Sequence, residues 1–477
     1  MREVKPRRQP RLQPSEVRRK NFDEVIQGYT AEEAMAEAQR CILCKNARCQ
    51  AACPLQNQIP KWIAALQQGK VDDAYRIIRE TSPMPELCSR LCPQERLCEG
   101  SCALGIKHEP VAIGLLERYV ADQGSQRVES NGRSASPKPA HVTKRVAAVG
   151  SGPASLAFAQ YMACCEGHEV TVFERWPRLG GVLRWIPRFK LPTEIMNRHL
   201  EALKQAGVTF KATTEVHSAR ALLGQGFDGV FLGIGASRPS APKIPGSSLA
   251  GVLSSTEFLV RIFYDRDALP NHWKPITSLA GQRVVVLGGG DSAMDCVRSA
   301  IRLGASNVTC VYRRDEANMP GSKKEVKAAK EEGANMQFLA SQTAFHSRDG
   351  KSVSSVECIR MELGPPDASG RCSPVPVEGS TFTVDADVVV LAFGYEVEPT
   401  LDEHAQLIPA KGIIKVNPTT GATTLPGVCA GGDCVTGPSL VSTAARSGIV
   451  AAQGLLRYFA GEPWEALAAP PVSASQA

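Results

Sequence analysis

The sequence concentrates thiols near its N-terminus, where eight of its sixteen cysteines lie between residues 41 and 102. They form two runs of four residues: Cys41, Cys44, Cys49 and Cys53, then Cys88, Cys92, Cys98 and Cys102. Clustered thiolates of this kind hold zinc or iron–sulfur clusters. Because zinc is redox-inert, the nucleotide-binding motifs further along the chain favour iron–sulfur clusters.

The order of the cysteines predicts crossed ligation. Proline follows Cys53 and Cys92, and in two-cluster ferredoxins the fourth cysteine of a Cys-Pro run ligates the other cluster. One predicted ligand set is therefore Cys41, Cys44, Cys49 and Cys102. The other set begins with Cys53, Cys92 and Cys98. Its fourth ligand is either Cys88 or a residue other than cysteine further along the chain.

A dinucleotide-binding fingerprint follows the buried-strand pattern at 145–149. It reads Gly150-Ser-Gly152-Pro153-Ala154-Ser155 and opens a helix of small and apolar residues. The first glycine permits a tight turn, and the second lets the backbone approach a pyrophosphate at the helix N-terminus. The next strand ends at Glu174, whose carboxylate would accept hydrogen bonds from ribose hydroxyls.

A second fingerprint follows the strand pattern at 284–287 and reads Gly288-Gly-Gly290-Asp291-Ser292-Ala293. Its next strand, at 308–312, ends in Arg313 and Arg314, where the first unit has Glu174. Guanidinium groups suit the 2′-phosphate of NADP(H), so this site is predicted to prefer NADP(H) over NAD(H).

A third glycine-rich turn, at 427–433, follows a short strand and precedes a helix. Such a turn can pass close to a flavin, with Gly432 at the approach and Asp433 bonding a ribityl hydroxyl. Two dinucleotide sites and this turn together predict a bound flavin and an exchangeable nicotinamide. No side chain need act as acid or base in hydride transfer, so no catalytic residue is assigned.

The pattern of apolar residues predicts the elements that position these motifs. Helical spacing at 30–40 and 59–80 places the cysteine runs on loops between helices. Residues 121–143, rich in Ser, Pro, Gly and charge, indicate a linker. After it, Val/Ile-rich runs alternate with helical stretches, which is typical of parallel α/β sheets. The predicted fold class is α/β, with an N-terminal all-α iron–sulfur domain followed by two Rossmann-like nucleotide-binding domains.

Composition excludes several other classes of protein. The net charge of +7 over 477 residues is modest, and only residues 1–20, with eight Lys/Arg against two acids, are strongly basic. This arm is expected to be a solvated extension or a docking arm for an acidic partner. We expect no nucleic-acid or membrane role, because no basic surface with interleaved aromatics and no long apolar run is evident. Sixteen cysteines without a secretory signal indicate a cytoplasmic protein.

Several motifs resemble the small (beta) subunit of NADPH-dependent glutamate synthase and its FAD/iron–sulfur relatives. The most specific are CPLQNQIPKW (53–62), LCPQERLCEGSC (91–102), YRRDEANMPGSKKEV (312–326) and FGYEVEP (393–399). The resemblance implies two 4Fe–4S clusters, FAD and NADPH. It also implies flavin contacts at Gly181 and Gly394. An Ile-Gly-x-x-Glu segment at 113–117 matches relatives that ligate the second cluster with Gln or Glu, which favours Glu117 over Cys88.

The resemblance also implies a division of the chain. It implies 1–125 for the helical domain, 144–245 and 393–461 for the split FAD domain, and 246–392 for the inserted NADPH domain. Composition separately predicts the linker at 126–143 and a disordered tail, rich in Pro, Ala and Ser, at 462–477. Trp185 stands in a flavin-proximal segment that lacks the family's glycine before Ile186. We therefore expect Trp185 to occupy that space.

The function implied is electron input to a partner. Glutamate synthase's large subunit would make the overall reaction L-glutamate formation from L-glutamine and 2-oxoglutarate. Ferredoxin or a pyrimidine-reducing subunit is the alternative acceptor. The segment at 108–113 is closer to the flavin subunits of NADPH–ferredoxin oxidoreductases. An adaptor without turnover is a further alternative, which the intact fingerprints disfavour.

Overall fold

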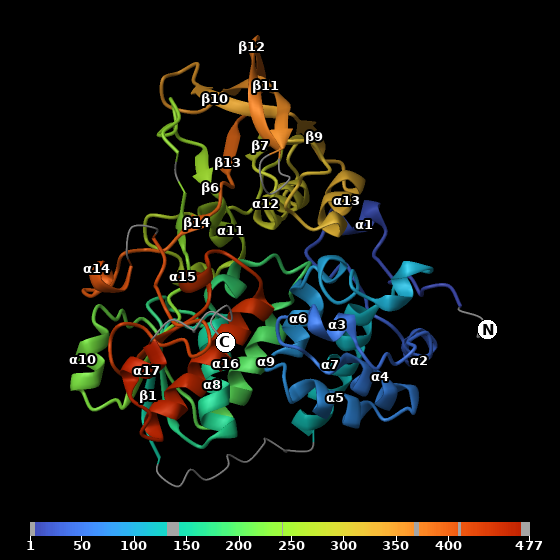
Figure 1. Ribbon diagram of the computed structural model, residues 1–477. Coiled ribbons are helices and arrows are strands. Elements are labelled where there is room, and N and C mark those ends of the chain that lie inside the picture. Colours follow the sequence, from blue (N-terminus) through green and yellow to red (C-terminus); the bar gives the residue numbers. More distant parts are fainter. Residues whose placement is uncertain (1–4, 131–142, 241, 367–371, 409–411, 469–477) are drawn as a thin grey trace.

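A computed structural model describes residues 5–130, 143–240, 242–366, 372–408 and 412–468. N-terminal helices lie beside one five-stranded parallel sheet, and a second five-stranded parallel sheet follows further from them, with a long antiparallel hairpin at its far end (Figure 1). This arrangement confirms the predicted α/β fold class with an N-terminal helical region.

The N-terminal region is helical, as the spacing predicts. Its elements are α1 (Ser15–Arg18), α2 (Ala31–Ala38), α3 (Arg48–Ala51), α4 (Ile59–Gln67), α5 (Val71–Arg79), α6 (Pro85–Leu91), the 3-10 turns η1 (Gln94–Arg96) and η2 (Ala103–Ile106), and α7 (Ile113–Ser130). Thr30 and Glu33 start α2 with reciprocal side-chain to backbone hydrogen bonds. The helical pattern at 59–80 forms two helices, because Gly69 between them has a positive φ of 74°.

The basic N-terminal arm packs on the body of the protein. Arg7 pairs with Glu99 at 2.7 Å, and the buried Arg18 pairs with Glu332 at 3.0 Å and with Glu331 at 2.5 Å. Glu331 is the last residue of α13 (Lys323–Glu331), and Glu332 follows it. Helix α13 lies beside α1 (Figure 1). The expectation of a solvated or partner-docking arm is therefore wrong for these arginines, because carboxylates of the same chain neutralise them.

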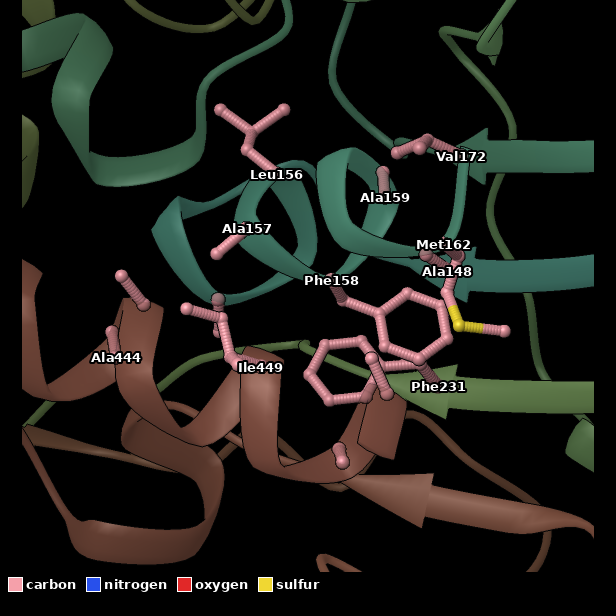
Figure 2. Close-up of a cluster of buried hydrophobic side chains, with 14 of the residues drawn as sticks. Ala148, Leu156, Ala157, Phe158, Ala159, Met162, Val172, Phe231, Ala444 and Ile449 are labelled. Atoms are coloured by element: carbon pink, nitrogen blue, oxygen red, sulfur yellow. The ribbon is translucent and has the colours of Figure 1, made fainter. Parts of the chain in front are cut away.

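The first sheet has the strand order β15 (Val428–Ala430), β4 (Gly229–Leu232), β1 (Arg145–Val149), β2 (Glu169–Phe173) and β3 (Thr209–Lys211). Helices α8 (Pro153–Gln160) and α16 (Val441–Phe459) pack against each other and both contact this sheet, and Figure 2 shows their shared apolar cluster. The rings of Phe158 and Phe231 stack with centroids 4.5 Å apart. A Cβ at Gly448 would lie 2.1 Å from the Ala154 carbonyl oxygen, so the two helices approach closely only because this residue is glycine. The other helices here are the π-turn η3 (Tyr161–Cys165), η4 (Gly181–Trp185), α9 (Thr193–Gln205) and α10 (Ala219–Gly224).

The second sheet has the strand order β6 (Val252–Ser254), β13 (Val388–Leu391), β7 (Arg283–Leu287), β8 (Asn307–Tyr312) and β9 (Asn335–Phe338). Its helices are α11 (Ser255–Phe263), η5 (Arg266–Ala268), α12 (Asp291–Arg302) and α13. An antiparallel sheet of β10 (Ala340–His346), β11 (Ser355–Pro366) and β12 (Cys372–Asp385) extends from it. The chain passes between the two large sheets twice, and the short strands β5 (Arg238–Pro239) and β14 (Tyr395–Glu396) pair along these crossings.

Two segment expectations differ from the structure. Helix α7 continues to Ser130, into the predicted linker at 126–143, of which residues 131–142 lie outside the described residues. The tail predicted to be disordered from residue 462 contains α17 (Trp464–Ala468), and its residues 469–477 lie outside the described residues. Trp464 is buried and donates its indole hydrogen to the Thr423 carbonyl oxygen at 3.0 Å, which fixes this turn against the first sheet's region. The short α14 (His404–Leu407) and α15 (Asp433–Thr436) precede α16.

Among the described residues, none of the helices combines the length and the apolar character needed to cross a membrane.

Candidate active site

The turn between β1 and α8 has the shape that the first fingerprint predicts. Gly150 has a φ of +91°, and a Cβ there would lie 2.5 Å from the Gly233 carbonyl oxygen. A Cβ at Gly152, by contrast, would meet no heavy atom within 4 Å. The backbone at the N-terminus of α8 therefore faces open space, which fits the approach of a pyrophosphate.

Glu174 anchors this turn from the end of β2. Its buried carboxylate accepts hydrogen bonds from the Ser151 N–H at 3.0 Å and the Ser151 hydroxyl at 2.5 Å. Its other oxygen accepts from the Trp176 N–H at 2.9 Å. Glu174 thus has a structural role in the turn as well as lining the cavity described below, where the oxygen that accepts from Trp176 retains a further lone pair for a ribose hydroxyl.

The late glycine-rich turn lies against the same helix. A Cβ at Gly432 would come 2.9 Å from the Ala154 Cβ, and one at Gly181 would come 3.0 Å from the Gly152 Cα. Burial raises the pKa of Asp433 to about 6, although a hydrogen bond from the Ser439 N–H opposes this rise.

The second fingerprint forms the turn between β7 and α12. Gly290 caps α12, and a Cβ on it would meet no heavy atom within 4 Å. Asp291 accepts a hydrogen bond from the Ser322 N–H at 2.8 Å, which joins the start of α12 to the loop before α13. Ala293 is buried against the sheet. The exposed backbone at this helix N-terminus again suits a phosphate group.

The two predicted phosphate-binding arginines at the end of β8 differ in environment. Arg313 is exposed, whereas Arg314 is buried and its Nε donates to the Cys372 carbonyl oxygen at 3.0 Å. Arg314 therefore also holds the hairpin at the start of β12, while the Arg313 guanidinium is accessible to a ligand.

A cavity of about 400 Å³ brings much of the predicted site together. The predicted residues in its wall are Gly150, Gly152, Pro153, Ala154, Glu174, Gly181, Asp291, Ser292, Gly432, Asp433 and Cys92. The predicted nucleotide-binding residues outside its wall are Ser155, Gly288, Gly290, Ala293, Arg313, Arg314 and Gly394. One continuous space therefore touches both fingerprints and a cysteine of the second predicted cluster.

The cavity wall also contains Trp185, Lys190 and Asp295, of which only Trp185 has an expected position from the sequence. Trp185 is buried, with its ring centroid 5.9 Å from that of Trp176, so its indole fills space beside the cavity. Lys190 and Asp295 form an ion pair at 2.8 Å. The only signal for Lys190 in the sequence is its place in the Ile-Pro-x-Phe-Lys-Leu segment, and the pairing itself depends on tertiary structure.

The first predicted thiol set surrounds a separate, small cavity. Cys41, Cys44, Cys49 and Cys102 all line it, together with apolar residues such as Ile63. Burial raises the pKa of Cys49 to about 12, and the neighbouring Cys102 and Cys41 add to this rise. Four thiols around one space fit a cluster that spans them.

The second set also converges, and it includes Glu117. Burial raises the pKa of Cys53 to about 11, and the nearby Glu117 and Cys92 add to this rise. The pKa of Cys98 is raised by burial and by Glu99, and then by Glu117, Cys53 and Cys92. Glu117 thus interacts electrostatically with Cys53 and Cys98, and Cys92 in turn raises the pKa of Glu117.

Within the described ranges, no three His, Cys, Asp or Glu side chains are arranged to hold a metal ion. The two thiol sets differ in their positions. Cys92 lies 3.5 Å from the Ser442 hydroxyl of α16, next to the large cavity. In contrast, Ile42 and Leu43 beside the first set are exposed.

Comparison with known proteins places the chain in a family. Residues 144–448 match the family described as pyridine nucleotide-disulphide oxidoreductase, and residues 18–129 match dihydropyrimidine dehydrogenase domain II, 4Fe-4S cluster. A glutamate synthase [NADPH] small chain from Escherichia coli (strain K12) is 38% identical over 94% of this chain and 96% of its own length. The chain belongs to the glutamate synthase small-chain family. The resemblance stated from the motifs is thereby confirmed.

Other members and neighbours have different names. The putative oxidoreductase AegA of Escherichia coli (strain K12) is 42% identical to this chain, and the match covers 93% of this chain and 68% of AegA. The structure of Mycobacterium tuberculosis FprA in complex with NADPH superposes with a TM-score of 0.55 at 19% identity, covering 67% of this chain and 85% of FprA. FprA shares the fold. The predicted enzyme class, an oxidoreductase of the glutamate synthase small-subunit type with a 4Fe–4S domain, is confirmed by the family matches.

Proposed function

We propose that this chain is an NADPH-oxidising electron-input subunit, in which reducing equivalents pass from NADPH to FAD and then through two 4Fe–4S clusters to a partner. The observation that carries this proposal is the single cavity that touches both glycine fingerprints and Cys92. In this proposal FAD is held by segments 144–245 and 393–461, NADPH by the inserted segment 246–392, and the clusters by 1–125.

The residues present fit these cofactors. FAD would lie over the open backbone at Gly152, with Glu174 at its ribose and Asp433 at its ribityl chain. NADPH would lie over Gly290, with Arg313 and Arg314 at its 2′-phosphate. A flavin bound there accepts a hydride and releases electrons singly. The chain's own part is to bind and orient both nucleotides and to exclude water from the cavity.

The positions of the thiol sets support an order of electron transfer. Cys92 lines the large cavity, which supports a second cluster on the side of the proposed flavin. Ile42 and Leu43, which flank the first set, are 51% and 40% exposed. We therefore place the exit to the partner at the first set, on the surface around these two residues.

The partner that we propose is the large subunit of glutamate synthase, so that the complex forms L-glutamate from L-glutamine and 2-oxoglutarate. The near full-length likeness to glutamate synthase small chains favours it. A second candidate is another acceptor, such as ferredoxin or a pyrimidine-reducing subunit, because the 42% identical AegA is named otherwise. Co-purification with a large subunit, and NADPH-dependent glutamate formation only when both chains are present, would favour the first candidate.

An anaerobic titration tests the proposed electron path. The purified chain should contain one flavin and about eight iron atoms, and NADPH should bleach first the flavin absorbance and then the cluster absorbance. A chain that binds no flavin, or whose flavin NADPH does not reduce, would exclude the proposal and favour a non-redox adaptor.

The arginine pair is tested by Arg313→Ala. Because a hydrogen bond to a charged group contributes about 1.5–3 kcal/mol, the variant should bind NADPH about 10- to 100-fold more weakly. Its affinity for NADH, which lacks the 2′-phosphate, should be unchanged. Equal weakening for both nucleotides, measured by flavin-reduction titrations, would remove Arg313 from the phosphate site.

A further inference from the structure

An ion pair crosses the cavity wall between the two nucleotide-binding sheets. Lys190 follows η4 in the first sheet's region, and its Nζ lies 2.8 Å from the Asp295 carboxylate on α12 and 3.7 Å from Glu325 on α13. The Lys190 and Asp295 side chains are only 14% and 10% exposed. Water therefore screens this pair less than the exposed ion pairs of the surface.

The residue before Lys190 is also held against α12. The guanidinium carbons of Arg298 and Arg302 lie 4.5 Å and 4.0 Å from the ring centroid of Phe189. The Phe189 carbonyl oxygen accepts a hydrogen bond from the Val25 N–H at 3.0 Å. The loop that carries Lys190 is thus fixed on one side to α12 and on the other to Val25, in the segment that follows the N-terminal arm.

Helix α12 is the element whose position matters for the nicotinamide site. It begins at Asp291, directly after the glycine fingerprint, and Asp295 lies about one turn further along. Any displacement of this turn displaces the backbone that faces the proposed NADPH pyrophosphate. The Lys190–Asp295 pair connects that turn to the loop after η4. Gly181, the first residue of η4, lies beside the flavin fingerprint, because a Cβ on it would come 3.0 Å from the Gly152 Cα.

The two backbone crossings restrain the relative orientation of the two large sheets only weakly, so side-chain contacts must fix it. The two crossings between the sheets pair only through β5 and β14, which have two residues each. A ladder this short is a weak restraint on rotation of one sheet relative to the other. The contacts of Phe189 and Lys190 with α12 connect the same two halves, and Lys190 also lines the cavity.

We propose that Lys190, held by Asp295, is a positioning residue for the hydride step: it sets the place of the α12 N-terminus, and so of the nicotinamide, relative to the flavin fingerprint. This inference rests on the proposed function. Hydride transfer requires the reacting atoms at near-contact distance, and a misplacement of about 1 Å can slow such a step about 100-fold. Substrate affinity depends instead on phosphate contacts that the pair does not make.

The test uses the holoprotein, with its flavin and iron content measured for every variant. Lys190→Met should lower the limiting rate of anaerobic flavin reduction by NADPH about 10- to 100-fold. The dissociation constant for NADP⁺ should remain within about twofold of the wild-type value. Hydrogen exchange should become faster in 186–192 and at the start of α12, which reports the loosened contact independently of turnover. Lys190→Arg should retain most of the rate, because its guanidinium also reaches the carboxylate.

Arg188→Met is the matched control. Arg188 lies two residues away on the same loop, is exposed, and reaches the Phe263 carbonyl oxygen at 3.5 Å rather than α12. It should reduce its flavin at the wild-type rate. Asp295→Asn removes the same ion pair from the other side and should reproduce the Lys190→Met rate, so the test does not depend on one variant folding.

The outcomes separate this inference from the proposed function. Failure of NADPH to reduce the wild-type flavin would overturn the proposed function itself. A wild-type flavin that is reduced, together with a wild-type rate in both Lys190→Met and Asp295→Asn, would overturn the positioning role alone. The role would also fail if the entire loss lay in nucleotide affinity or equally in the Arg188→Met control.

Discussion

Replacing Glu117 with alanine is expected to lower the iron content from about eight to about four atoms per chain, while Cys88→Ala leaves about eight. Glu117 acts on each of Cys53, Cys92 and Cys98. We therefore propose that Glu117 completes the second four-ligand set. Burial raises the pKa of Glu117 well above its usual range, and the nearby Cys92 and Glu86 raise it further. Such a site disfavours a free carboxylate, and an iron ion would offset that cost.

Cys88 has a different relation to the same set. Its thiol hydrogen bonds to Cys92, which raises the pKa of Cys88 well above its usual value, and burial adds to this rise. The Cys88 thiol thus donates a hydrogen bond to Cys92, which is a proposed cluster ligand. Cys88→Ala should keep both clusters and change only the potential of the second, because hydrogen bonds to cluster sulfurs tune that potential.

Iron analysis and low-temperature EPR of the reduced protein would distinguish the two residues. Cys98→Ala serves as the positive control, since Cys98 belongs to the second set under either assignment. A loss of four irons in Cys88→Ala, with full iron in Glu117→Ala, would exchange their roles. Electron transfer to a protein acceptor should stop in Glu117→Ala, while reduction of the flavin by NADPH continues.

The parts of the site that the sequence predicts are those fixed by local backbone geometry. The turn at Gly150 needs a positive φ, and Gly152 and Gly290 need open space beside a helix N-terminus. The spacing of these glycines in the sequence therefore predicts both turns. The convergence of Cys102 with the run at 41–49 is also predictable, because a Cys-Pro run is typical of crossed ligation in two-cluster ferredoxins.

The parts that the sequence does not predict depend on pairings between distant residues. Lys190 and Asp295 are 105 residues apart, and Arg18 and Glu332 are 314 apart. Nothing in the local pattern of either residue specifies its partner. The same holds for the arginines at the end of β8, where the contact of Arg314 with Cys372 depends on how the hairpin folds back. Residue type predicts that a side chain is charged. Tertiary structure determines whether that charge pairs with a ligand or with a neighbouring residue.

Glu332 is the most connected of these unpredicted groups. Its carboxylate is fully buried, lying 3.0 Å from Arg18, 2.8 Å from Arg298 and 2.6 Å from Arg302. Burial alone would raise the pKa of Glu332, but hydrogen bonds from Arg302 and Arg298 lower it to about 2. Because the folded-state pKa lies below the unfolded value of 4.5, this group stabilises the fold above pH 4.5. That contribution is lost as the pH falls towards 2.

Glu332→Gln should lower the free energy of unfolding by about 3–5 kcal/mol, because it leaves three guanidinium groups without their shared counter-charge in a buried site. The expected measurement is the shift of the urea midpoint, multiplied by the slope of that transition. Glu331→Gln is the matched control: Glu331 also pairs with Arg18, but its side chain is 41% exposed, and its loss should cost about 0–1 kcal/mol. Similar small costs for both variants would show that Glu332 is not the centre of this cluster. The Glu332→Gln variant should also lose less stability than the wild type between pH 5 and pH 3, since it lacks the titrating carboxylate.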